Sequence, residues 1–270
     1  MIDGPTKILD GMEAVIDRHF FSIEEIARGH RYFQKRSCNA FSKNPPKSFD
    51  GAALVTAMYG GIENSLAQRP DDRTPSSENW KLRSTKDHDM RRPSANNKSV
   101  EVKLERAIVE EWPNSWNYQM PIASGLFDEH SDKRRAVDLV FDHQDEHYDL
   151  VELKVNMKAG SPLYAAMEIL CYGLVYMASR SDRAGNLKYN TTDLPVLRAN
   201  SITLCVLAPE SYFKGSQLMW LQCAINEGLE RLTPSGLKLD FCFKKFGGTW
   251  CDDLPQIHLP DVLVLETVWQ

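Results

Sequence analysis

Two short runs of strand-forming residues, separated by a polar turn, constrain the fold of this chain most strongly. The runs, 136–141 (AVDLVF) and 148–155 (YDLVELKV), are rich in the β-branched and aromatic residues that strands favour. The six residues between them are all polar or charged. We therefore predict an antiparallel hairpin centred on Asp145.

The register of this hairpin decides which side chains become neighbours. Centring it on Asp145 places Asp138 opposite Glu152, with Cβ atoms about 4.5–5.5 Å apart. Because side chains alternate along a strand, Lys154 shares the face of Glu152, whereas Leu153 points to the other face, which we expect to be the core. Two carboxylates at this separation repel each other unless a cation lies between them.

The pattern predicts a site for Mg²⁺, which takes a few carboxylate oxygens and keeps several waters. Asp138 and Glu152 would supply the carboxylates. Lys154 would orient an attacking water or offset charge on a phosphate. The same three residue types on an antiparallel sheet are also compatible with an ordinary solvated face.

Helices are predicted on both sides of the hairpin in the sequence. In 99–112, apolar residues recur every four positions, and Glu105 borders that stripe. After the hairpin, Ser161 and Pro162 have the residue types of an N-cap and a first helical position. The helix that follows, to about residue 178, is apolar nearly all round, as expected for a helix buried against a sheet.

This order of elements, over residues 98–210, resembles the PD-(D/E)xK nuclease superfamily, which has the restriction-endonuclease-like fold. The resemblance implies an αβββαβ core and hydrolysis of phosphodiester bonds in nucleic acid, with DNA as the expected substrate and Mg²⁺ or Mn²⁺ as cofactor. By the same resemblance, Asp138, Glu152 and the Leu153 carbonyl bind the metal. Lys154 positions or activates the water, and Glu105 completes the site or holds a second ion.

Other residues compete for or support these roles. Glu101 lies one turn before Glu105 and is its rival. Glu168 and Tyr172 resemble the glutamine-x-x-x-tyrosine motif of exonuclease-like branches, with glutamate in place of glutamine, and would support the site from behind. The triplet 101–103 (EVK) with the preceding Asp71 matches the literal signature better. We reject that match because 101–103 lies within a helical pattern.

The net charge limits how the chain can contact nucleic acid. The net charge of −5 does not predict a broad basic surface, so any contact with nucleic acid must be local. Lys133, Arg134 and Arg135 lead directly into the Asp138 strand and are the best-placed candidates, with the basic residues of 81–98 as a second group.

A rival hypothesis is an inactive module of the same fold that acts through protein contacts. A homodimer, DNA against RNA, and internal against terminal cleavage stay open.

Three regions are expected along the 270 residues: an N-terminal helical region (1–66), a polar linker or mobile loop (67–97) and an α/β domain (98–270). The fold class is therefore α/β, with a mixed central sheet and helices on both faces. No apolar run is long enough to predict a membrane span, and the first residues lack the order of a secretory signal, so we expect a cytoplasmic protein. The six cysteines read as reduced thiols, and His143 and His147 as exposed turn residues.

Overall fold

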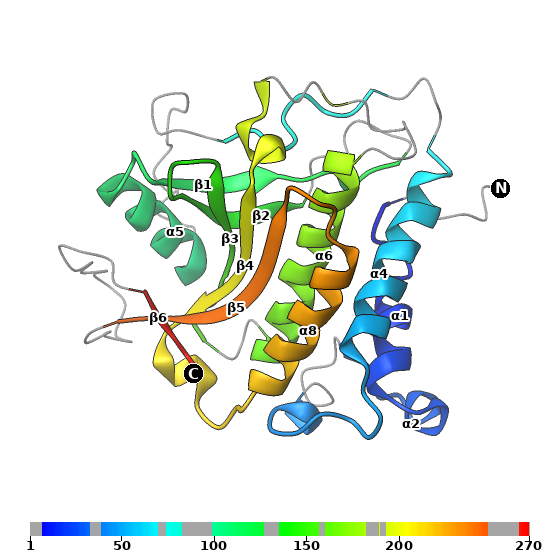
Figure 1. Cartoon of the computed structure of the whole chain (residues 1–270). Helices are drawn as coiled ribbons and strands as arrows, with labels where there is room; N and C mark the ends of the chain where they lie inside the picture. The colour runs from blue at the N-terminus through cyan, green and yellow to red at the C-terminus, as the bar shows by residue number, and fades with distance from the viewer. Residues whose placement is uncertain are drawn as a thin grey trace.

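A six-stranded mixed β-sheet with helices on both faces forms the centre of the computed structural model, so the predicted α/β class is confirmed (Figure 1). The structure describes residues 7–32, 39–69, 74–82, 99–126, 135–156, 160–181, 189, 193–247 and 265–269. The strands are β1 (Trp116–Pro121), β2 (Ala136–Asp142), β3 (His147–Leu153), β4 (Ser201–Ala208), β5 (Lys238–Phe246) and β6 (Leu265–Thr267). They lie in sequence order, with β3, β4 and β5 parallel and the other neighbours antiparallel.

The β2–β3 hairpin has the predicted register. Leu139 pairs with Val151 and Val140 with Leu150. Continuing this antiparallel register by one residue brings Asp138 opposite Glu152, as expected from the position of the turn.

Helices cover the two faces of the sheet unequally. The face in Figure 1 that carries α6 (Pro162–Ser181), α8 (Met219–Leu232), α4 (Gly51–Leu66) and α1 (Met12–Phe20) holds the larger core. The other face is covered by α5 (Val100–Glu111), which contributes Leu104, Ile108 and Val109 to a smaller core. The remaining helical elements are α2 (Ile23–Ala27), η1 (Asn39–Phe41), η4 (Pro195–Arg198) and α7 (Glu210–Phe213).

Because both faces are covered, β3 is buried on both sides. Leu150 belongs to the larger core, whereas Val151 and Leu153 belong to the smaller one. Leu153 faces a core, as expected, whereas the alternative of a solvated face around Glu152 and Lys154 is wrong because both residues are buried.

The long helix α6 begins where its cap residues predict. Ser161 Oγ accepts a hydrogen bond of 3.2 Å from the backbone N–H of Tyr164, and Pro162 occupies the first turn. Among the described residues, α6 is the one helix long and apolar enough for a membrane span, but 89% of that stretch is buried inside the protein. It is thus packed as a core helix.

The N-terminal helices pack directly on the α/β layers. At Gly51 of α4 an added Cβ would lie 2.4 Å from the Ala224 carbonyl oxygen of α8, so only glycine permits this approach. Trp80, within the segment expected to be a linker, is fully buried and contacts Tyr176 edge-on at a centroid distance of 5.6 Å. Residues 70–73 and 83–98 of that segment lie outside the described part of the chain.

Candidate active site

A pair of carboxylates lies where β2 and β3 run side by side. Glu152 is 4% exposed, and Asp138 is partly buried beside it. The backbone N–H of Leu153 donates a 2.9 Å hydrogen bond to Asp138 Oδ2, which fixes the aspartate across the two strands. The structure thereby brings together the two predicted metal ligands.

Lys154 follows β3, and its side chain points towards this pair of carboxylates. Lys154 is 7% exposed, and its ammonium forms an ion pair with Glu152 Oε1. A second contact of 3.4 Å joins Lys154 Nζ to Glu168 Oε2 on α6. The predicted neighbourhood of Lys154, Glu152 and Glu168 is therefore present in the structure.

Glu105 reaches the group from α5 and is held there by a residue that the sequence analysis missed. Gln119 Nε2 donates a 2.7 Å hydrogen bond to Glu105 Oε2, and Glu105 is only 2% exposed. In the β1–β2 register, Gln119 falls opposite Asp138, because its neighbours Tyr118 and Met120 pair on either side of that position. Gln119 has a left-handed backbone, with φ 49°, which is rare for a non-glycine residue and frequent at functional sites.

The buried carboxyl groups outnumber the basic side chains beside them, and their pKa values are raised. Burial raises the pKa of Glu105 to about 8, and the nearby Asp138 carboxylate adds to the shift. Burial also raises the pKa of Asp138 to about 6, against the opposing effect of Lys154. The pKa of Glu152 is raised well above its usual value by burial and by Asp138. Burial alone would lower the pKa of Lys154, but Glu152, Glu168 and Asp138 together raise it.

Two further polar atoms near this group lack partners among the described residues. Glu101 Oε1 is buried and accepts no hydrogen bond there, although Glu101 interacts electrostatically with Glu105 and Asp138. The hydroxyl of Tyr212, in α7, is likewise buried without a partner and interacts electrostatically with Lys154 and Glu152. Buried polar atoms are rarely left unsatisfied, so both atoms are available to a further partner as far as the described residues show.

Four acidic residues of this group have donor atoms of the kind that divalent cations bind. Asp138, Glu152, Glu105 and Glu101 supply hard oxygen donors, and Lys154 is the basic side chain that forms ion pairs with this group. Mg²⁺ and Mn²⁺ prefer oxygen donors of this kind. The role of the Leu153 carbonyl as a ligand stays a prediction.

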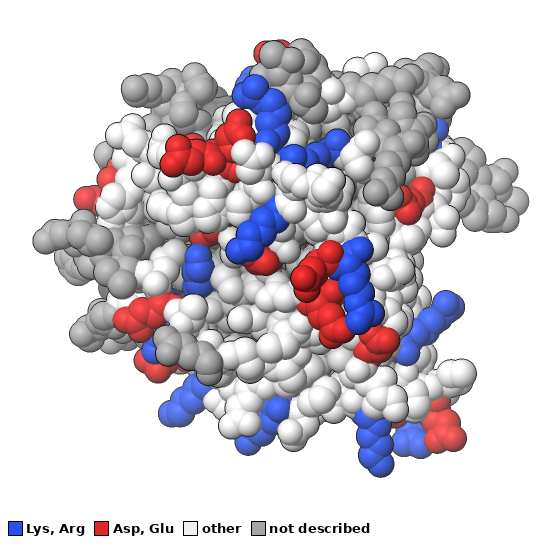
Figure 2. Space-filling view, viewed as in Figure 1, with Lys and Arg blue, Asp and Glu red and all other residues white. Residues whose placement is uncertain are grey.

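The predicted nucleic-acid residues are only partly described. Arg135, exposed at the start of β2, hydrogen-bonds to Tyr172 of α6 and interacts electrostatically with Glu168. Lys133 and Arg134 lie outside the described residues, as does most of the second basic group. On the face shown in Figure 2, described Lys and Arg side chains are interspersed with Asp and Glu rather than gathered in one basic surface.

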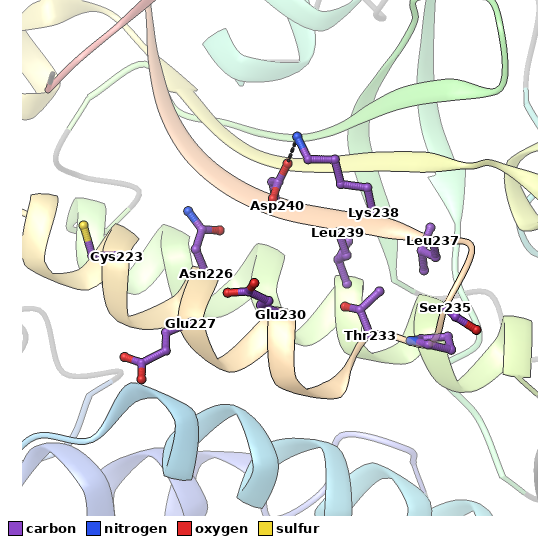
Figure 3. Close-up of a pocket in the computed structure, with 11 residues that line it drawn as sticks. Cys223, Asn226, Glu227, Glu230, Thr233, Ser235, Leu237, Lys238, Leu239 and Asp240 are labelled. Carbon is purple, nitrogen blue, oxygen red and sulfur yellow. Dashed lines mark ion pairs between the residues drawn. The ribbon is translucent and has the colours of Figure 1, made fainter.

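A hollow between α8 and β5 is unrelated to this group (Figure 3). Its volume is about 760 Å³, and several of its polar side chains make structural contacts. Asn226 exchanges two hydrogen bonds with the backbone of Phe241, and Lys238 pairs with Asp240 at 2.7 Å.

No family model, curated protein or solved structure matches the chain. The geometry of the carboxylate group, with the elements that carry it, is therefore the basis for assigning a function.

Proposed function

We propose that the chain is a Mg²⁺-dependent nuclease of the PD-(D/E)xK type that hydrolyses phosphodiester bonds, with DNA as its substrate. The order α5–β1–β2–β3–α6–β4 and the mixed sheet support a restriction-endonuclease-like αβββαβ core. The signature residues also fall at the places which that core requires: the aspartate on β2, the acid–x–lysine at the end of β3, and a glutamate on the preceding helix.

One observation carries the proposal. Asp138 and Glu152 face each other on neighbouring strands, both with raised pKa values, and Glu105 adds a third buried carboxyl group. A purely structural cluster of this kind would be costly, because burying like charges destabilises the folded chain. A divalent cation removes that cost, and in a bound state it would supply Lewis-acid polarisation of a phosphoryl oxygen.

The chain's own residues divide the work around such an ion. Asp138, Glu152 and the Leu153 carbonyl would hold it, and Glu105 would complete the site or hold a second ion. Lys154 has a raised pKa and stays protonated, so we assign it the positioning of water and the neutralisation of phosphate charge rather than proton abstraction. An ammonium has three N–H donors, and the contacts to Glu152 and Glu168 leave one for the substrate.

Substrate contact is proposed at the start of β2. Arg135 is exposed there, and its hydrogen bond to Tyr172 orients the guanidinium beside the carboxylate group. A planar guanidinium binds phosphate oxygens in a bidentate manner. Arg135, together with the preceding Lys133 and Arg134, would therefore hold the backbone of the nucleic acid next to the scissile phosphate.

The test is cleavage of supercoiled and linear DNA by the purified chain with Mg²⁺ or Mn²⁺. Lys154→Ala should lower the rate by at least about 100-fold, the scale seen when one preorganised charge-stabilising donor is removed. Lys103→Ala is the matched control, since Lys103 is exposed on α5. Equal rates in the Lys154 variant and the parent chain would assign the cleavage to other residues or to a contaminant.

A further inference from the structure

A second group of ligand-type side chains lies at the other end of β3, on the opposite face of the sheet. His143 and His147 flank the β2–β3 turn, and Asp149 follows two residues later. By strand alternation, Asp149 shares a face with Val151 and Leu153, on the α5 side, whereas Glu152 points to the α6 side. This group is thus separate from the carboxylates described above.

The three side chains converge on one point. His143 Nε2 lies 3.0 Å and His147 Nε2 3.8 Å from Asp149 Oδ1. The two imidazole rings stack with centroids 4.1 Å apart and an interplanar angle of 10°, and His147 Nε2 also lies 3.4 Å from Thr203 Oγ1. The potential ligand atoms of the three residues all lie within 4.8 Å of one another.

The aspartate at the centre points independently to a ligand. Asp149 is 1% exposed, yet its Oδ1 accepts no hydrogen bond from the described residues. The short distances to the histidine nitrogens therefore do not have hydrogen-bond geometry. In a metal chelate, a nitrogen lone pair is directed at the ion rather than at the neighbouring ligand oxygen, so the lack of such geometry agrees with chelation.

We propose that His143, His147 and Asp149 bind one Zn²⁺ ion. Two imidazole nitrogens and one carboxylate oxygen are a ligand set that zinc takes with an open fourth position for water. Ligand atoms in a tetrahedral zinc site lie about 3.3 Å apart, given bonds of about 2.0–2.1 Å. The present separations of 3.0 and 3.8 Å require only small rotations of the two partly exposed imidazoles.

Lys244 is the main electrostatic obstacle, and its position limits the effect. Its ammonium contacts the other carboxylate oxygen of Asp149, Oδ2, at 2.7 Å, so it leaves Oδ1 to the ion. The proximity of that charge should weaken Zn²⁺ binding. Lys244→Met is therefore expected to bind Zn²⁺ at least severalfold more tightly, a change opposite to that of losing a ligand.

The turn between the histidines gives such an ion a structural role. Gln144, Asp145 and Glu146 have φ values of 67°, 54° and 59°, three consecutive non-glycine residues in the left-handed region. That conformation is unfavourable for residues with a Cβ. An ion bound by His143 and His147 would connect the two ends of this strained turn and hold it closed.

Zn²⁺ titration of the full chain in excess Mg²⁺ tests the site. We expect His143→Ala and His147→Ala each to lose one equivalent of bound Zn²⁺, or to bind it at least about tenfold more weakly. His19→Ala, which removes a histidine on α1, should bind like the parent chain. The parent chain should also gain thermal stability on adding Zn²⁺, and the two ligand variants should not.

Any other outcome contradicts the proposed zinc site. Equal Zn²⁺ stoichiometry and affinity in His143→Ala and the parent chain would mean that zinc binds elsewhere, for example at the Asp138 carboxylate. Absence of binding to the parent chain would mean that the three residues form only a structural network with Lys244. Neither result bears on nuclease activity, which the proposal assigns to different residues.

Discussion

Gln119 Nε2 donates a 2.7 Å hydrogen bond to Glu105 Oε2, and this single bond joins β1 to α5 at the carboxylate group. Gln119 also lies opposite Asp138 in the sheet register, so one side chain relates the helix carboxylate to the strand carboxylate. The positive φ of Gln119 indicates that the chain accepts local strain to keep this arrangement.

Gln119→Met should shift metal binding to a higher pH range. The hydrogen bond from Gln119 lowers the pKa of Glu105, so its loss leaves the carboxyl protonated to a pH above about 8. Near neutral pH, Mn²⁺ affinity should fall severalfold, and it should recover at higher pH. Gln68→Met is the control, because Gln68 is an exposed residue that follows α4. An unchanged pH profile in Gln119→Met would contradict the proposed part of Glu105 in the site.

Glu105 should make the metal-free chain less stable as the pH rises. Its pKa is about 8 in the folded chain against 4.5 for an unperturbed glutamate, so the folded state binds the proton more tightly. The stabilisation is complete below about pH 4.5 and is lost progressively as the pH rises through 8.

Glu105→Gln removes this titration and should flatten the curve of unfolding free energy against pH by up to about 5 kcal/mol. Glu110→Gln, an exposed change on the same helix, should leave the curve as it is in the parent chain. Denaturant unfolding at a series of pH values without divalent ions measures the difference. Parallel curves for Glu105→Gln and the parent chain would show that the folded structure does not raise the pKa of Glu105.

Tyr212→Phe should separate activity from stability. The Tyr212 hydroxyl is buried with no hydrogen-bond partner among the described residues, so removing it should leave the unfolding free energy unchanged or raise it by about 1 kcal/mol. If the hydroxyl positions water or phosphate in the site, kcat should fall about tenfold with little change in KM. Tyr176→Phe is the contrast, because its hydroxyl donates a 2.9 Å bond to the Val196 carbonyl. That variant should lose stability and keep its kcat; a Tyr212→Phe enzyme with full kcat would remove Tyr212 from the site.

The parts of the fold that local sequence determines were predictable. The turn at 142–147 fixed the register of β2 and β3, because an antiparallel hairpin has a single centre, and Asp138 accordingly falls opposite Glu152. The start of α6 followed from the residue types of Ser161 and Pro162, whose preferences depend only on neighbouring backbone groups.

What escaped prediction depends on contacts between distant segments. Gln119 gains its role from a register between β1 and β2, across a connection of more than a dozen residues, and nothing in its own neighbourhood marks it. Tyr212 comes from α7, far along the chain. The convergence of His143 and His147 on Asp149 depends on the left-handed turn between them, whereas the sequence indicated only two exposed turn histidines.

Calorimetric titration of Mn²⁺ into the parent chain and into Asp138→Asn tests the central claim most directly, with Asp240→Asn, which alters a half-exposed carboxylate on β5, as control. The account predicts that the parent chain and the Asp240 variant bind Mn²⁺ alike, and that Asp138→Asn binds it at least about tenfold more weakly. Mn²⁺ binding that is absent from the parent chain, or unaffected by the loss of the Asp138 carboxylate, would contradict a metal-dependent hydrolase and favour a module of this fold that acts without turnover.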